Sequence, residues 1–576
     1  MVTALTHRGP DAEGLRSFNG CAFGMRRLRV VDLRPEADQP MTGESGDIWL
    51  VYNGELYNHV ELRRELTTLG HTFRSRSDTE VIVHGYEQWG EGVVGRLRGM
   101  FAFAIWEKRA RRLLLARDRL GIKPLYLLDE PGGGLSFASE VRAFGRRELD
   151  AAALATYLRM GWTGTRAISA GVREMPPGTF LVVDDAGRRS TTYWQPTWRD
   201  DALDLEALGS ALRNSVSRHL EADVPVGIFL SSGLDSAVIG SLAAATDHDV
   251  TAYTVGYDVG GDEIPEARAR AQDLGLKHES VSVSGADVVA QAPSIVGNMD
   301  QPTVDGVNSW IISRAVRNAG MTVALSGLGG DELFRGYSTF RKAPRLAALS
   351  RLPVRQMARG ASAVLSESSR LRDSRSHRAL ESVAMGGLHN AYGAVRAIFP
   401  MSSVARLWPA GAHLLKPAAA DPDLLMSSGG DQTVGRLELA NYLRYQLLRD
   451  TDAMSMAHSL EVRVPLLDDQ VVEAALATRP AATGQVGKSA LAMAARLPAS
   501  LATQPKMTFT LPFDRWLRSD LRPWAIESLE ILGRSSLGFD HNAVTGCYDE
   551  FEAGRLGWRS LWALVSLGGW IGAHEA

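Results

Sequence analysis

The feature that most constrains the fold is a strand–loop–helix unit in the middle of the chain, "IFLSSGLDSA" (Ile228 to Ala237). A short apolar run predicts a buried strand, and a loop of small residues then leads into an apolar helix that we expect to begin near Asp235 and Ser236. Further strand-like and helix-like stretches alternate after it, in "VTAYTVGY", "EARARAQDLG" and "HESVSVS". This alternation is typical of an α/β fold with a parallel sheet.

The rest of the chain predicts a second kind of architecture in front of this unit. Residues 1–145 contain short apolar runs separated by Gly-centred turns, which favours a layered, mostly β domain. Residues 146–205 read as a connector, with one helical piece and a strand pair around a turn. Residues 206–576 hold the α/β unit and become mainly helical after about residue 335. Two or three domains suit a length of 576 residues.

The composition indicates which binding partners and which cellular compartment to expect. The formal net charge is −3, so there is no electrostatic reason to expect binding to nucleic acid or to an anionic membrane. No apolar run is long enough for a membrane span, and no leader pattern is present. Two cysteines, Cys21 and Cys547, fit a reducing compartment, so we expect a cytoplasmic location. Only seven of the 63 basic residues are lysine, so each lysine is a candidate for a role that needs an ammonium group.

The loop of the central unit has the properties of an oxyanion site. Small residues at Ser231 and Gly233 let the backbone approach an anion, and the following helix offers free N–H groups at its N-terminus. The hydroxyl of Ser236 adds a donor, and Asp235 could hold Mg²⁺ against phosphates. No lysine follows the loop, so it is not a P-loop of the GxxxxGK[ST] kind.

A second turn of the same kind lies in "VALSGLGGDELFRGY", Val323 to Tyr337. It again follows an apolar strand, and it carries the acidic residues Asp331 and Glu332. In a parallel sheet both turns lie at the carboxyl ends of their strands, which is the ligand side. Asp235 and Asp331 could then share one metal ion, although two ordinary helix N-caps would produce the same pattern.

These two turns, together with "MSMAHSLEVRVPLLD", resemble the asparagine synthetase family, which are glutamine-dependent amidotransferases with an ATP pyrophosphatase domain. "HRGPD", "YNGELYNH", "SDTEV", "GMFAFAIW", "RDRLGIKPLY" and "FASEVRAF" resemble its N-terminal glutaminase domain, in the right order. The resemblance covers nearly the whole chain. It implies a truncated αββα domain of the N-terminal-nucleophile type, followed by a parallel-sheet pyrophosphatase (PP-loop) domain with a helical extension.

The resemblance implies a reaction and a set of site residues. Family members adenylate a carboxylate with MgATP, release pyrophosphate and let an amine attack the acyl-adenylate. Asp235 and Asp331 would bind magnesium, Lys488 and Lys506 would be the catalytic lysines, and Arg463 would be structural. The residues implied to bind ATP are Ser231, Gly233, Asp235, Ser236, Val255, Gly256 and Gly327, and those implied to meet the substrate are Asp300, Asp305 and Leu328.

Two positions depart from the family pattern in the synthetase half. Ser232 stands where the family usually has glycine, at the point where the backbone meets phosphate. Leu328 stands where asparagine-forming members have a glutamate, and a leucine can neither ionise nor form a hydrogen bond. We therefore expect the acceptor side of the pocket to be less polar than aspartate chemistry requires.

A third departure concerns the glutaminase half, whose nucleophile is an N-terminal cysteine several tens of residues before "HRGPD". The sequence begins at Met1, so we expect the first strand and most of the first helix to be absent, with Cys21 a small core residue. The residues implied to hold glutamine are nevertheless present: Arg27, Asn53, Gly54, Glu55 and Asp78. Such a pocket would bind glutamine without hydrolysing it.

Four interpretations follow. The first is an adenylating, amide-forming ligase that joins a specialised-metabolite carboxylate to free ammonia or another amine. The second is an ATP-independent catalyst of rearrangement or cyclisation, and the third is a non-catalytic scaffold or glutamine sensor. The fourth is an ordinary asparagine synthetase with a misassigned start. The expected partners are small molecules, and the resemblance also allows a homodimer.

Overall fold

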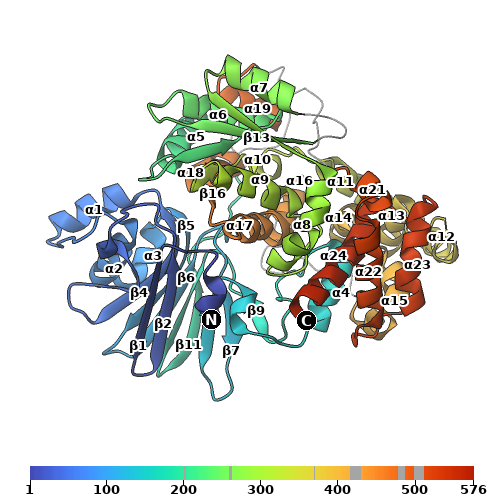
Figure 1. Ribbon diagram of the computed structural model, residues 1–576, viewed down its shortest axis with the longest axis horizontal. Coiled ribbons are helices and arrows are strands. Elements are labelled where there is room, and N and C mark those ends of the chain that lie inside the picture. The colour runs from blue at the N-terminus through green and yellow to red at the C-terminus, as the bar shows by residue number, and fades with distance from the viewer. Residues whose placement is uncertain are drawn as a thin grey trace.

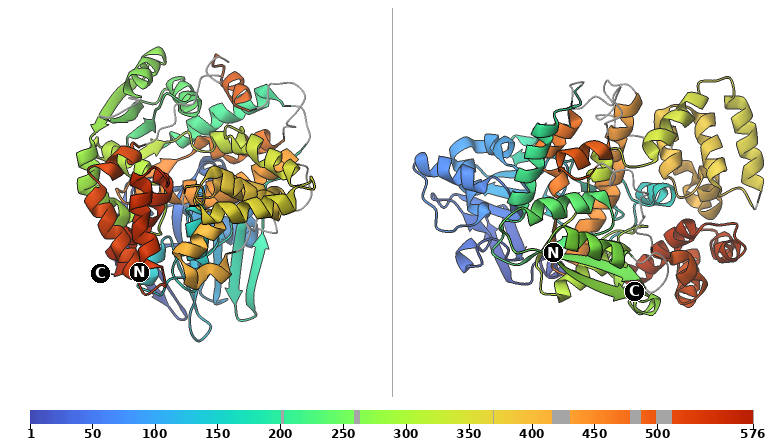
Figure 2. Two further views of the ribbon diagram at one scale, coloured as in Figure 1. Left: turned by 90° about the vertical axis from the view of Figure 1, so that its right-hand side faces the viewer. Right: turned by 90° about the horizontal axis from the view of Figure 1, so that it is seen from above.

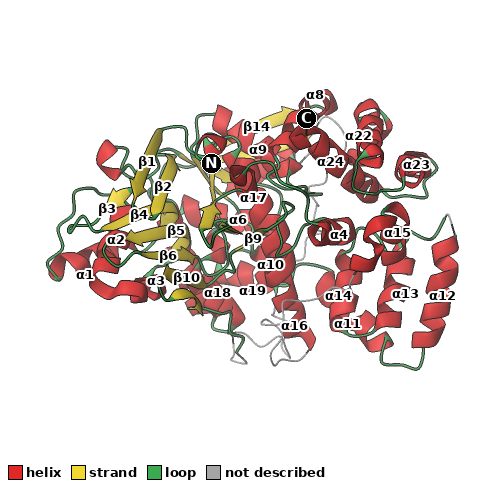
Figure 3. Ribbon diagram, turned by 90° about the horizontal axis from the view of Figure 1, so that it is seen from below, coloured by secondary structure: helices red, strands yellow, loops and turns green. Residues whose placement is uncertain are grey.

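The computed structural model describes residues 1–199, 203–257, 263–368, 370–415, 430–477, 487–498 and 511–575. In Figure 1 the N-terminal strands, coloured blue, gather on one side of the molecule and the C-terminal helices, coloured red, on the other. Figure 3 shows the same separation from below, with strands β1 to β6 at one end and helices α11 to α15 at the other. The β layers and the helical extension are thus separate parts of the chain's architecture.

The N-terminal part is built from β-sheets that face one another. Its six-stranded sheet has the order β11-β10-β6-β5-β4-β3, a three-stranded sheet has the order β8-β7-β9, and β1 and β2 form a hairpin. The strands are β1 (Ala12–Phe18), β2 (Cys21–Arg27), β3 (Met41–Thr42), β4 (Ile48–Leu56), β5 (Gly99–Glu107), β6 (Arg112–Arg117), β7 (Tyr126–Asp129), β8 (Leu135–Ala138), β9 (Val172–Glu174), β10 (Thr179–Asp184) and β11 (Gly187–Thr192).

Strand β5 explains why these layers form. Phe101, Phe103 and Ile105 pack on one face of the sheet, in a core shared with helices α1 (His59–Thr68) and α2 (Asp78–Trp89). Ala102, Ala104 and Trp106 pack on the other face, in a core shared with strands β2 and β7. Successive residues of a strand point to opposite faces, so an unbroken apolar strand requires cover on both sides. The layered β prediction is confirmed.

The segment expected as a connector contributes strands to these sheets. The strand pair around a turn is present as β10 and β11, which pair antiparallel, and β10 also pairs with β6. Strand β9 pairs with β7. A local sequence pattern predicts a strand but not its partner, so this long-range pairing was not foreseen.

The C-terminal part contains a five-stranded parallel sheet with the order β14-β13-β12-β15-β16. Its strands are β12 (Val226–Phe229), β13 (Thr251–Tyr257), β14 (Lys277–Val283), β15 (Val323–Leu325) and β16 (Glu461–Arg463). The α/β prediction is therefore confirmed. From β12 the chain runs outward to β13 and β14, and then returns to add β15 on the other side. The point where the order reverses lies between β12 and β15, which is where open α/β sheets bind ligands.

Helices cover both faces of this sheet. Val226 and Ile228 of β12 pack in a core with α5 (Leu205–His219) and α6 (Leu234–Ala244), whereas Ala324 of β15 packs on the opposite face with α9 (Val307–Asn318). The right-hand view of Figure 2 shows the yellow helices and the dark-red C-terminal helices at the end of the molecule opposite the blue N-terminal strands. None of the described helices is long and apolar enough to cross a membrane.

The other helices of the described residues are α3 (Val93–Arg96), α4 (Ala151–Met160), α7 (Ile264–Asp273), α8 (Gly285–Asn298), α10 (Gly330–Leu333), α11 (Thr339–Leu349), α12 (Arg355–Glu367), α13 (Arg375–Met385), α14 (Leu388–Arg396), α15 (Met401–Leu407), α16 (Gly430–Leu437), the π-helix η7 (Glu438–Leu448), α17 (Arg449–Met456), α18 (Asp469–Leu476), α19 (Lys488–Ala494), α21 (Phe513–Arg518), α22 (Arg522–Arg534), α23 (His541–Glu552) and α24 (Trp558–Glu575). Single turns of 3₁₀-helix include η4 (Val141–Phe144), which lies where the N-terminal part contacts the C-terminal part.

Candidate active site at the sheet edge

The loops that follow β12 and β15 meet at the point where the strand order reverses. A Cβ atom added at Gly327 would lie 2.8 Å from the backbone carbon of Asp235 and 2.9 Å from the nitrogen of Ser236. A Cβ at Gly330 would lie 2.4 Å from Oδ1 of Asp235. Because both distances are shorter than van der Waals contact, only glycine lets the second loop approach the start of α6 this closely.

The first loop is held in shape by its own hydroxyl groups. The Ser236 hydroxyl lies 3.0 Å from the Ser231 hydroxyl and also accepts the Ser231 N–H at 3.1 Å. The Ser231 hydroxyl accepts the Gly233 N–H at 3.2 Å. Ser231, Gly233 and Ser236 are therefore joined by hydrogen bonds that fix a loop at the N-terminus of α6, where oxyanions are favoured, and their role in binding ATP stays a prediction.

A buried carboxyl group lies beside this loop. Burial raises the pKa of the Glu263 carboxyl above its ordinary value, and the nearby backbone N–H of Ser232 partly opposes the rise. The Ser232 N–H therefore lies close to a carboxyl group. Glu263 was not among the predicted site residues, because it lies outside both motifs.

Lys488 joins the two predicted metal ligands. Its Nζ atom lies 2.8 Å from Oδ1 of Asp331 and also forms an ion pair with Asp235. Burial lowers the pKa of Lys488, but the two carboxylates outweigh burial and hold the pKa above its usual value. The side chain is therefore a cation at neutral pH. The structure brings Asp235, Asp331 and Lys488 to one point between the loops.

Val255 and Gly256 lie at the carboxyl end of β13, beyond the end of β12. Both are buried, and the preceding Thr254 hydroxyl donates to the carbonyl of Leu230 at 2.7 Å, next to the first loop. Leu328 is half-buried in the second loop and packs against the apolar core around β12 and β15. The second loop thus contributes an apolar, half-buried side chain next to the candidate site.

The two predicted substrate carboxylates have different surroundings. Asp300 is buried and accepts the backbone N–H groups of Val141 at 2.8 Å and Arg142 at 3.0 Å, which gives it a structural role between the two parts. Asp305 accepts the N–H of Gly306 at 3.0 Å, and burial raises its pKa. Its charge also acts on Tyr442, a ring 5.7 Å from that of Tyr337.

Glu332 is a buried acid next to Asp331, and the sequence motifs assign it no role. The Tyr337 hydroxyl donates to Glu332 at 2.6 Å, and burial raises the pKa of Glu332 to about 7. The Arg396 guanidinium lies 4.5 Å from the centre of the Tyr337 ring. The sequence shows Glu332 as an acidic residue of the turn, but burial of its carboxyl depends on contacts with distant helices.

The predicted glutamine-holding residues line one cavity in the N-terminal part, with a volume of about 740 Å³. Arg27, Asn53, Gly54, Glu55 and Asp78 all border it. Asp78 already has protein partners, because the Tyr52 hydroxyl and the Leu56 N–H donate to it at 2.8 and 3.0 Å. The structure therefore brings these five residues together, and their role as a glutamine pocket stays a prediction.

Cys21 borders the same cavity from strand β2. It packs against the core between the sheets, as expected, and burial raises the pKa of its thiol to about 11. A thiol with this pKa is protonated at neutral pH and is a poor nucleophile.

Buried charges connect this cavity to the C-terminal part. Arg463, predicted to be structural, is fully buried and donates to Glu55 at 2.8 Å and to Glu461 at 2.9 Å. Lys123 is also buried, and its Nζ lies 3.5 Å from Asp452. The scarcity of lysine in the sequence was the signal that could have identified Lys123. Lys506, the second predicted catalytic lysine, lies outside the described residues.

Comparisons with known proteins agree with this architecture. The chain matches the family model described as "Asparagine synthase" over residues 207–572 and the one described as "Glutamine amidotransferase domain" over residues 1–194. It is 31% identical to "Asparagine synthetase [glutamine-hydrolyzing] 1" of Bacillus subtilis over 551 residues, which covers 91% of this chain and 85% of the relative. It is 30% identical to "Asparagine synthetase [glutamine-hydrolyzing] 3" of the same organism over 505 residues, covering 82% and 76%.

Among solved structures, the chain matches the glutamine phosphoribosylpyrophosphate amidotransferase from B. subtilis complexed with ADP and GMP. The two are 18% identical, with a TM-score of 0.26, over 56% of this chain and 77% of the other. This likeness is too small to support an argument.

Proposed function

The chain belongs to the asparagine synthetase family, whose members are ATP-dependent amide-forming ligases, and we propose that this one acts on a specialised-metabolite carboxylate without using glutamine. The observation that carries the proposal is the meeting of Lys488, Asp235 and Asp331 between two glycine-containing loops at the sheet edge. The reaction would activate the carboxylate as an acyl-adenylate, release pyrophosphate, and form the amide when an amine displaces AMP.

The residues present fit ATP and magnesium. The loop from Ser231 to Ser236 offers hydroxyl and N–H donors for phosphate oxygens, and its Ser232 N–H lies close to the Glu263 carboxyl. Asp235 and Asp331 offer the carboxylate oxygens that Mg²⁺ prefers, and the ion would offset phosphate charge when bound. Because Lys488 pairs with the same two carboxylates, its ammonium can turn toward the phosphates while remaining close to them.

The substrate assignment depends on Leu328. Its half-buried side chain extends the apolar core to the candidate site, at the position where asparagine-forming members have a glutamate. An apolar wall favours a carboxylate with an apolar portion over aspartate, because burying a polar group without a partner costs free energy. Asp305 remains a candidate contact for a polar group of the substrate.

The proposed nitrogen source rests on the environments of Cys21 and Cys547. Cys21 borders the N-terminal cavity as a protonated thiol, and Cys547 is buried in helix α23. Neither offers a thiolate to an amide in the cavity. Free ammonia or another amine would therefore supply the nitrogen.

A pyrophosphate-release assay tests the proposal. The purified chain is incubated with MgATP, ammonia or an amine, and a panel of carboxylic acids that includes aspartate. We expect release with an acid that has an apolar portion, loss of release in Asp235→Asn, and no change in Asp249→Asn, which alters an exposed surface aspartate. Release with aspartate alone would refute the substrate class, and release of glutamate from glutamine would refute the nitrogen source.

A second candidate function is an ATP-independent rearrangement or cyclisation of a metabolite. The observation that favours it is the Glu263 carboxyl close to the Ser232 N–H, since a carboxyl group there would compete with phosphate. Product formation at an unchanged rate when ATP is omitted would select this function over the first.

A further inference from the structure

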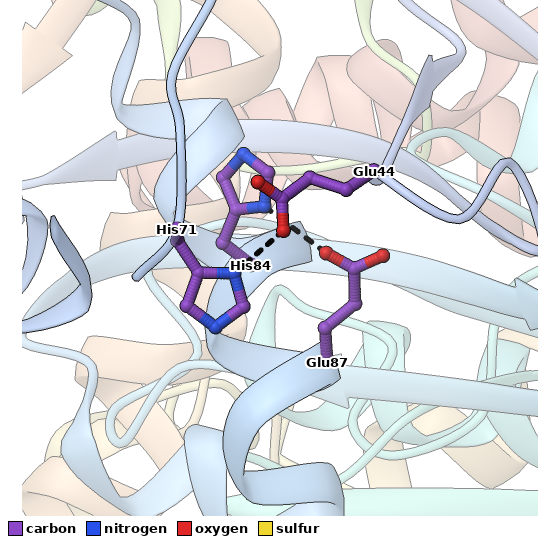
Figure 4. A group of neighbouring side chains, drawn as sticks. All are labelled: Glu44, His71, His84 and Glu87. Atoms are coloured by element: carbon purple, nitrogen blue, oxygen red, sulfur yellow. Dashed lines mark hydrogen bonds and ion pairs between the residues drawn. The ribbon is translucent and has the colours of Figure 1, made fainter. Parts of the chain in front are cut away.

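Four side chains outside the candidate active site converge in the N-terminal part. Glu44 comes from the loop between β3 and β4, His71 from the loop after α1, and His84 and Glu87 from α2 (Figure 4). One potential ligand atom from each of the four lies within 4.8 Å of all the others. His84 and Glu87 are three residues apart on the helix, so they share one face.

We propose that Glu44, His71, His84 and Glu87 bind one divalent transition-metal ion of the Zn²⁺ class. Two imidazole nitrogens and two carboxylate oxygens are a ligand set suited to Zn²⁺ in tetrahedral coordination. Mg²⁺ and Ca²⁺ prefer oxygen ligands alone, so the two imidazoles select against them. The ion would fasten the 43–47 loop and the segment after α1 to helix α2.

The outer nitrogens of both histidines have acceptors that orient the rings. The Nε2 atom of His71 lies 3.2 Å from Oε1 of Gln88, and that of His84 lies 3.4 Å from Oε1 of Glu80. Glu80 is itself fixed, because it accepts two backbone N–H groups at 2.8 Å. With a proton on each Nε2, the Nδ1 lone pairs face the cluster, which is the arrangement of metal-bound histidines.

The Nδ1 atoms contact the two carboxylates directly. His71 Nδ1 lies 3.0 Å from Glu44, and His84 Nδ1 lies 3.0 Å from Glu87. Among the described residues, these imidazoles are the only ion-pair partners of Glu44 and Glu87. A metal ion would bind between these imidazole nitrogens and carboxylate oxygens without displacing a lysine or arginine from either carboxylate.

The carboxylates are also positioned by the backbone. Glu44 accepts the N–H and the hydroxyl of Thr72, each at 2.8 Å. A Cβ atom at Gly43 would lie 2.3 Å from Oε1 of Glu87, so a glycine is required where this carboxylate approaches the loop. The ligands are thus held in place by surroundings that are independent of one another.

Calorimetric titration with Zn²⁺ tests the proposal on the full chain after treatment with a chelator. We expect one ion to bind per chain, with affinity at least about 100-fold lower in His71→Ala, and about 10- to 100-fold lower in Gln88→Leu, which removes an outer partner. His541→Ala is the matched control, because it removes a histidine that lies 3.9 Å from Glu530 outside the cluster. Its affinity should equal that of the wild type.

His71 and Glu44 are chosen because they lie at the edge of the cluster, and circular dichroism verifies that the variants fold. Co²⁺ then supplies a second readout, because tetrahedral coordination gives visible absorption that His71→Ala and Glu44→Gln should both lose. Equal Zn²⁺ affinity in the wild type and His71→Ala, or displacement of Zn²⁺ by an equal concentration of Mg²⁺, would overturn the proposal. The measurement does not involve ATP, so it is independent of the proposed ligase activity.

Discussion

At the scale of single residues, the candidate active site depends on the ammonium group of Lys488, which forms ion pairs with two carboxylates. Asp235 and Asp331 come from different loops, and the Lys488 cation between them lowers their mutual repulsion. In the proposed reaction the same cation would be available to phosphate charge that develops during pyrophosphate release. An arginine is larger and planar, so it cannot reproduce a point contact with both carboxylates.

Lys488→Ala is expected to reduce pyrophosphate release by about 10²–10³-fold, the usual cost of removing one group that stabilises transition-state charge. Lys488→Arg should recover only part of this loss. Lys342→Ala, which changes an exposed lysine of α11, is the control and should retain full activity. Steady-state rates of pyrophosphate release measure all three variants, and equal rates in the two alanine variants would remove Lys488 from the site.

Leu328→Glu is expected to lower the free energy of unfolding by about 1–3 kcal/mol, because the new carboxyl would be half-buried against an apolar core without a partner. Leu328→Met keeps the volume and the apolar character, so it should cost less than about 1.5 kcal/mol. Urea denaturation measures both changes. Efficient amidation of aspartate by the Leu328→Glu variant would show instead that the pocket retains the acceptor chemistry of asparagine formation.

At the scale of elements, the site exists because two loops touch. The start of α6 and the loop after β15 lie so close together that a Cβ atom added at Gly327 or Gly330 would overlap atoms of Asp235. Parallel strands place both loops at one edge, and the order of the strands makes them neighbours. The distance between Asp235 and Asp331 is therefore a property of the sheet as well as of the motifs.

Gly327→Ala is expected to weaken ATP-dependent activity more than it weakens the fold, because its Cβ would press on the backbone of Asp235 and Ser236. Gly360→Ala is the matched control, since a Cβ there meets no atom within 4 Å and lies in helix α12. This control should raise stability by up to about 1 kcal/mol and leave activity unchanged. Pyrophosphate release and thermal unfolding of both variants make the comparison, and an active Gly327→Ala would show that the loops can separate.

The sequence predicts these elements well where the signal is local. The apolar run and small-residue loop at Ile228 to Ala237 become a buried strand, a tight loop and a helix, because each of these elements follows from the local residues. The position of Asp300 depends on a contact with Val141 and Arg142, more than 150 residues away, so its structural role could not be read locally. The burial of Glu332 and of Lys123 also depends on residues that are distant in the sequence, so local patterns could not predict it.

At the scale of the whole molecule, buried ion pairs join the N-terminal layers to the C-terminal part. Arg8 contacts Glu140 at 2.9 Å and Asp452 at 2.7 Å, and so links the start of the chain to helix α17. Arg463 links Glu55 to strand β16. Removing one partner of a buried pair leaves a charge without compensation and typically costs about 3–5 kcal/mol. The two parts should therefore unfold as one unit when these contacts are intact.

The buried ion pair between Arg8 and Glu140 is expected to depend on pH, because the Glu140 carboxyl can be protonated. Burial raises the pKa of its carboxyl, but His7 and Arg8 outweigh burial and lower the pKa from 4.5 to about 2. The folded state therefore favours the ionised carboxylate, and its contribution to stability is complete above about pH 4.5 and is lost as the pH falls toward about 2. Since each pKa unit corresponds to about 1.4 kcal/mol, the contribution at neutral pH is about 3 kcal/mol.

Glu140→Gln cannot ionise, so the difference in unfolding free energy between the wild type and this variant should be largest at neutral pH. We expect that difference to stay constant down to about pH 4.5 and then to shrink steadily at lower pH, by the linkage argument above. Urea denaturation at a series of pH values measures it. Glu61→Gln, which changes an exposed glutamate of α1, is the control and should differ from the wild type by a small, nearly constant amount. A Glu140→Gln difference that does not change between neutral and acidic pH would mean that the ion pairs of Glu140 do not stabilise the junction through its charge.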